Sequence, residues 1–199
     1  MDSQVPQVVA QVTRKAAARL LSGCARGLVL LAAWFWPARG AEFKFLEQIG
    51  TVNLFRLDRF VAADAFQLGR KIGGRTLSTV GLNFAEHFLG VVENTIATAS
   101  LQVWSLQYTM GDASLIRQLG GPERAVVQFV WHIYGLMEMH EGPSHTDGRS
   151  NFAYMRSPVD QRLWAVHWSV NFANEWTIGA VYVPHPHMDW RSGSYLLAH

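Results

Sequence analysis

The spacing of the apolar residues changes once along the chain, at Gly142-Pro143, and this change constrains the fold more than any other feature of the sequence. Before that point, apolar residues tend to recur every three or four positions, which is typical of amphipathic helices. After it they recur at every second position, which is typical of strands that bury one face. The order predicts an α+β fold, with N-terminal amphipathic helices followed by a C-terminal antiparallel β-meander.

The first half of the domain is expected to be mainly helical. Apolar stripes predict one helix over residues 54–68 and a second over 84–99. A short helix is expected at 112–119, before the helix stop at Gly120-Gly121, and a longer one at about 122–140. The last of these is nearly apolar all round, so we expect it to be the most buried helix. One weak strand is expected at 101–110.

The second half predicts three antiparallel strands within residues 151–183. A turn at Ser157–Asp160 has proline at the position that a type I turn favours. Residues 162–172 alternate most regularly, and five of them are expected to face the helices: Trp164, Val166, Trp168, Val170 and Phe172. Helices followed by a meander is also the order found in cystatin-like or NTF2-like cones, an analogy of architecture that carries no function.

Residues 1–40 have the order of a secretory signal. A basic start precedes the apolar run 27–36, which a helix-breaking proline and small residues follow. We expect cleavage after Gly40, which leaves a single domain, residues 41–199, in the periplasm or secreted. The alternatives are an uncleaved membrane anchor at the interface, a mitochondrial transit peptide, a lipoprotein modified at Cys24, and an ordinary first helix.

The net charge of +2 belongs to the leader and not to the domain. Residues 41–199 hold twelve basic and fourteen acidic residues, with no dense basic patch along the sequence. We therefore expect no nucleic-acid partner. Charged residues make up only 16% of the chain, which favours a face held against a partner or a membrane surface.

Two segments are rich in potential metal ligands. Residues 138–147 contain five such residues, and residues 185–189 add three more. The candidate ligands for zinc or iron are His140, His145, His185 and His187. Their spacing matches no zincin signature, and histidines are also common at helix ends and in solvated loops. The predicted meander works against this site, because it places residues 145 and 185 at opposite ends of the sheet.

No catalytic residue can be assigned from the sequence. His132 and His167 are single histidines, each either a general base or an ordinary structural residue. There is no nucleophile elbow and no glycine-rich phosphate loop. We therefore expect an exported envelope accessory or assembly protein that binds a protein partner, without catalysis or a cofactor. The alternatives are a metal-binding protein or metal-dependent enzyme, and a binding module for a glycan or an apolar ligand.

Overall fold

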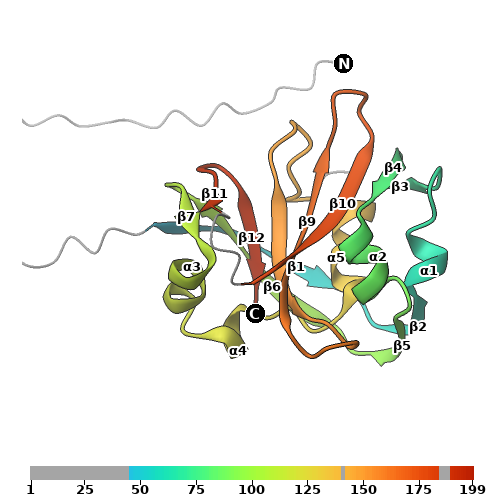
Figure 1. Ribbon diagram of the computed structural model, residues 1–199, viewed down its shortest axis with the longest axis horizontal. Helices are drawn as coiled ribbons and strands as arrows, with labels where there is room; N and C mark the ends of the chain where they lie inside the picture. The colour runs from blue at the N-terminus through green and yellow to red at the C-terminus, as the bar shows by residue number, and fades with distance from the viewer. Residues whose placement is uncertain (1–44, 140–141, 184–188) are drawn as a thin grey trace, which may run out of the picture. The chain divides into compact units, whose positions relative to one another are not determined.

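A mixed eight-stranded sheet forms the centre of the domain in the computed structural model, which describes residues 45–139, 142–183 and 189–199 (Figure 1). Its strands are β1 (Leu46–Leu54), β3 (Lys71–Ile72), β4 (Arg75–Val80), β6 (Ala99–Leu106), β8 (Asn151–Arg156), β9 (Leu163–Val170), β10 (Trp176–Tyr182) and β12 (Tyr195–Ala198). They lie in the order β1-β6-β12-β8-β9-β10-β4-β3. Pairing is antiparallel except between β12 and β8 and between β10 and β4.

Shorter elements flank this sheet. Two small sheets pair β2 (Leu57–Val61) with β5 (Val92–Ile96), and β7 (Met110–Gly111) with β11 (Asp189–Trp190). The described helices are α1 (Ala62–Ala65), α2 (Leu82–Phe88), α3 (Asp112–Gln118), α4 (Pro122–Ala125) and α5 (Val130–Glu138). All of them are short, so they cover the sheet in patches.

The central strands separate two apolar cores, one on each face of the sheet. One core contains residues of α1, α2, α5, β2 and β5, and the other contains residues of α3, α4 and β11. In β8, Ala153 and Met155 belong to the first core, whereas Phe152 and Tyr154 belong to the second. Successive strand residues point to opposite faces, so the sheet is buried from both sides at β8.

The predicted meander is confirmed as β8, β9 and β10. Consecutive strands pair antiparallel, from Asn151 opposite Trp168 to Tyr182 opposite Trp164. Four residues of the predicted inner face are buried in the first core: Trp164, Val166, Trp168 and Val170. The prediction for Phe172 is wrong. This residue lies beyond the end of β9, in the turn to β10, and is fully exposed.

The predicted fold class is wrong, because the first half is not built of amphipathic helices. Residues 54–68 contain the end of β1, then β2 and the four-residue α1. Residues 84–99 contain α2 and β5, which are separated by Gly90. Neither the helix-then-sheet order nor the cone-like analogy therefore holds. Strands of five residues give too few positions for a period of two to be told from a helical period.

The long helix expected at about 122–140 is interrupted. Residue Val126 is extended and forms a parallel bridge to Tyr154 of β8. The helix resumes as α5, where Glu93 of β5 accepts hydrogen bonds from the N–H groups of Val130 and Trp131, at 2.6 and 3.0 Å. A carboxylate from a distant strand therefore caps α5, which has no capping side chain of its own. This helix is largely buried, as expected.

The leader and the domain boundary at residue 40 lie outside the described residues, so both remain predictions. Within the part of the chain that is described, no helix is long and apolar enough to cross a membrane.

Two aromatic residues of the predicted inner face, Trp168 in its middle and Phe172 at its end, give a stability test. Trp168 is completely buried, and its indole N–H donates to the Ser144 hydroxyl at 3.2 Å. Replacing Trp168 by Ala should lower the free energy of unfolding by about 3–5 kcal/mol, because a cavity is left in the core. Phe172→Ala is the matched control and should change it little. Urea denaturation measures both, and comparable losses would contradict the assigned faces.

Candidate functional site

Only one of the four predicted metal ligands lies in the described part of the chain. His140, His185 and His187 fall outside it, and within the described residues no group of three or more potential ligands is close enough to hold a metal ion. The start of β8 and the end of β10 lie at opposite ends of the sheet (Figure 1), but Asp189 of the second ligand-rich segment lines a pocket together with Gly148 and Arg149. The zinc or iron site therefore stays a prediction.

His145 is a buried residue whose Nε2 has a hydrogen-bond partner. Its Nε2 lies 2.6 Å from the carbonyl oxygen of Gly193, so this nitrogen carries the hydrogen that is donated. Its Nδ1 lies 3.5 Å from a carboxylate oxygen of Asp147, and its ring stacks on Tyr195 with centroids 3.5 Å apart. Burial lowers the pKa of His145, against the opposing effects of Gly193 and Asp147. These contacts fix the loop before β8.

The two histidines that the sequence suggests as possible general bases, His132 and His167, lie in apolar surroundings. His132 of α5 is almost completely buried, and neither ring nitrogen has a hydrogen-bond partner among the described residues. Desolvation, together with the nearby His199, lowers its pKa to about 4. His167 faces the second core, opposite Gly179 and with its ring centroid 6.1 Å from that of Trp190. Burial lowers the pKa of His167 as well. Both imidazoles are therefore neutral near pH 7.

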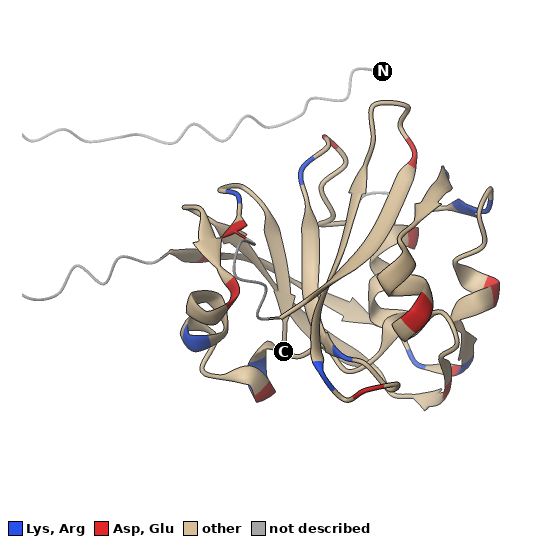
Figure 2. Cartoon of the chain, in the orientation of Figure 1, with Lys and Arg blue, Asp and Glu red and all other residues tan. Residues whose placement is uncertain are grey.

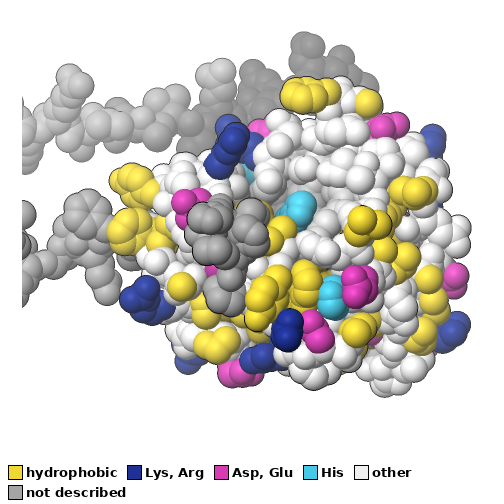
Figure 3. Space-filling model, in the orientation of Figure 1, with side chains coloured by type: hydrophobic (Ala, Val, Ile, Leu, Met, Phe, Trp, Pro, Cys, Tyr) yellow, Lys and Arg dark blue, Asp and Glu magenta, His cyan; other side chains and the backbone are white. Residues whose placement is uncertain are grey.

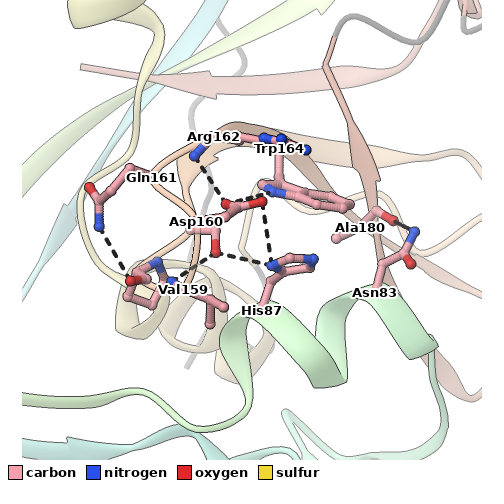
Figure 4. A network of polar contacts seen from close by, with 10 residues as sticks. Asn83, His87, Val159, Asp160, Gln161, Arg162, Trp164 and Ala180 are labelled. Carbon is pink, nitrogen blue, oxygen red and sulfur yellow. Dashed lines mark hydrogen bonds and ion pairs between the residues drawn. The ribbon is translucent and has the colours of Figure 1, made fainter.

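A fourth histidine, which no sequence motif singles out, lies in a polar cluster with a serine and an aspartate. His87 is in the last turn of α2, and Ser157 and Asp160 belong to the turn between β8 and β9 (Figure 4). The Nδ1 of His87 is 3.1 Å from the Ser157 hydroxyl and 4.0 Å from Asp160. The imidazole also lies against Trp164, with ring centroids 4.0 Å apart.

The cluster holds the turn in place through a set of converging donors. Asp160 accepts hydrogen bonds from the Arg162 N–H at 3.0 Å and the Trp164 indole at 3.4 Å (Figure 4). Desolvation acts to raise the pKa of Asp160, but these donors, with Ser157 and His87, hold it below its ordinary value. The Ser157 hydroxyl also accepts the Val159 N–H at 3.1 Å.

The same three residue types form a catalytic triad in other proteins, but their arrangement here differs. In a triad, the hydroxyl and the carboxylate contact opposite nitrogens of the imidazole. Here Ser157 and Asp160 both face Nδ1, and Ser157 is completely buried. A hydroxyl in that position has no access to a substrate. The arrangement therefore supports a structural role, in which α2 is fastened to the β8–β9 turn.

A second candidate feature is the free edge of the sheet at β1. Within the described residues, β6 is the only strand that pairs with β1. The extra residue Ile49 interrupts that pairing as a bulge, and the register is then regular from Gly50 to Leu54. Apolar residues are exposed singly over several elements on the face shown in Figure 3, together with scattered charges. Of the two edge strands of the eight-stranded sheet, β1 is the longer, with nine residues against two in β3.

Comparison with known proteins finds no family model that matches this chain, no similar curated protein and no similar solved structure.

Removing the Ser157 hydroxyl tests the structural role of the cluster. Ser157→Ala leaves the Val159 N–H and the His87 Nδ1 without their partner in a buried site, which should cost about 1–3 kcal/mol of unfolding free energy. Ser100→Ala, at an exposed position of β6, is the control and should have little effect. If chemical denaturation shows that Ser157→Ala leaves the free energy of unfolding unchanged, the structural interpretation is wrong.

The unpartnered imidazole of His132 predicts a specific dependence of stability on pH. In the unfolded chain His132 binds a proton below about pH 6.5, whereas in the folded domain it binds one only below about pH 4. The contribution of His132 is therefore fully present above pH 6.5 and is lost as the pH falls towards 4, by roughly 3 kcal/mol. His132→Leu should flatten the curve of unfolding free energy against pH in this window. Curves that stay parallel for both proteins would contradict the assignment.

Proposed function

We propose that the domain binds a partner protein by accepting an extended segment of that protein along β1. The domain would act as an exported accessory or assembly component of an envelope complex, without catalysing a reaction. The observation that carries the proposal is the free edge itself, where β1 pairs with β6 on one side only. A partner strand gains affinity by hydrogen bonding to such an edge and gains specificity from the neighbouring side chains.

The two edges of the sheet differ in a way that favours β1. At the opposite edge, β3 is only two residues long. Short strands are one of the ways in which proteins protect an edge from further pairing. By contrast, β1 has nine residues, of which the last five keep a regular register with β6. Along this regular part, Gly50, Thr51 and Asn53 are exposed while Val52 and Leu54 are buried.

The bulge at Ile49 limits where the partner can bind. A bulge bends the strand and interrupts the ladder, so it discourages pairing across it. An added strand is therefore expected along Gly50–Leu54, and its side chains on one face would lie beside Thr51 and Asn53. Both of these are polar and uncharged, which favours polar residues at the corresponding positions of the partner.

Photo-crosslinking in the native host tests this mode of binding. A photoreactive residue is placed at Thr51 in one variant and at Asn53 in another, and the linked residues of the partner are identified by mass spectrometry. Strand addition requires both positions to reach one segment of one protein, at residues about two positions apart. Gln118, at the exposed end of α3, is the control position.

A peptide with the sequence of the linked segment then provides a second measurement. Its binding should slow amide hydrogen exchange at the outward-facing N–H groups of Gly50–Leu54, because these become hydrogen bonded. The proposal is wrong if crosslinks from Thr51 and Asn53 scatter over unrelated proteins, or do not exceed those from Gln118. It is also wrong if the peptide binds without protecting β1.

A further inference from the structure

Two loops enclose a pocket of about 320 Å³ at the end of the sheet where β8 and β12 begin. These strands are parallel neighbours, so the loop before each one reaches the same end, and each loop carries one arginine (Figure 2). The lining residues are Gly148, Arg149, Ser150, Asp189, Trp190, Arg191, Ser192 and Ser194. Two arginines and three serines therefore line one small space, together with one aspartate, and this site is separate from the β1 edge.

Arg149 forms an ion pair at the protein surface, where its side chain is 59% exposed and that of Asp147 is 53% exposed. Its Nε lies 3.3 Å from a carboxylate oxygen of Asp147, whose other oxygen accepts the Arg149 N–H at 3.2 Å. The guanidinium also lies over Gly193, which has a φ of +80°, and a Cβ at that position would be only 3.2 Å from Nη1. Glycine thus permits both the backbone turn and the close approach of the arginine.

Two further groups in the pocket are left without partners by the rest of the domain. Arg191 forms no ion pair within the described residues. Ser194 is only 4% exposed, and its hydroxyl makes no hydrogen bond to another described group. A buried hydroxyl that lines a pocket and lacks a partner is available to a ligand. Ser192 differs, because its hydroxyl donates to the Gln107 carbonyl at 2.8 Å.

We propose that this pocket binds the phosphate group of a small phosphate monoester. Arginine forks match the geometry of phosphate oxygens, and hydroxyl donors complete the set. The volume is about ten times the ~30 Å³ that one water occupies in the liquid, which leaves room for an organic group beside the phosphate.

Asp189 gives the site a means of selecting among anions. Its carboxylate lines the same pocket, so it repels a ligand that offers only acceptors. Hydrogen phosphate carries a P–OH group that can donate to this carboxylate, and a monoester carries one below its second pKa of about 6, so the preference for a monoester over sulfate is expected in mildly acidic solution. Sulfate carries no proton near neutral pH. The pocket should therefore prefer phosphate to sulfate.

Calorimetric titration of the domain with O-phosphoserine, inorganic phosphate and sulfate tests the site. O-phosphoserine should bind at a single saturable site, and sulfate at least tenfold more weakly. Equal affinities for O-phosphoserine and inorganic phosphate would assign the site to free phosphate, whereas tighter binding of the ester assigns it to a monoester. Amide chemical shifts of Gly193 and Ser194 should move on binding, which locates the ligand.

Variants of the two arginines connect that binding to the pocket. Arg149→Gln and Arg191→Gln should each weaken binding at least tenfold, whereas Arg117→Gln, on the exposed side of α3, should not change it. Arg149→Lys keeps the charge but loses the two-pronged geometry of the guanidinium, so its affinity for phosphate should lie between those of the wild-type protein and Arg149→Gln. Asp189→Asn should reduce the preference for phosphate over sulfate. The proposal is overturned if neither phosphate compound saturates, if binding survives in a stably folded Arg149→Gln, Arg191→Gln double variant, or if wild-type protein binds sulfate equally well.

Discussion

Strands β8 and β9 have apolar neighbours on both faces, and the arrangement of the other elements depends on this two-sided burial. A strand that is covered on one side only can alternate apolar and polar residues, but Phe152, Ala153, Tyr154 and Met155 of β8 are all buried. Each large apolar side chain that is fully buried stabilises the fold by about 1.5–3 kcal/mol. The short helices, too small to be stable alone, are ordered because they cover these two faces.

Two-sided burial also brings polar groups into the cores, where each needs a partner. Asp112, the first residue of α3, accepts hydrogen bonds from the Tyr154 hydroxyl and the Trp190 indole, each at 2.7 Å. This carboxylate links α3 and β11 to β8. On the other side of the sheet, Glu93 holds the start of α5 in the same way. Buried carboxylates with several donors therefore position both helices, and Glu93 also replaces the local cap that α5 lacks.

Sequence reasoning succeeded where the pattern is local and failed where pairing is long-range. The alternation in residues 162–170 predicted the meander, since β8, β9 and β10 follow one another with short turns. In the first half, Leu54, Leu57, Val61 and Ala65 have helical spacing but belong to three different elements. The four residues of β12 carry no signal that places them between β6 and β8. The polar sites were missed for the same reason, because His87 and Ser157 are brought together only by the packing of α2 on β10.

The loop before β8 shows how the buried polar groups extend to the surface. Asn151, completely buried at the start of β8, accepts the His145 N–H at 2.7 Å and donates to the carbonyls of His145 and Trp168. His145 in turn donates to the Gly193 carbonyl, which ties this loop to the loop before β12. Because both loops are fixed by groups inside the domain, the separation of Arg149 and Arg191 is set by the core and not by the loops themselves. In the pocket proposed above, such preorganisation would lower the entropy cost of binding a small anion.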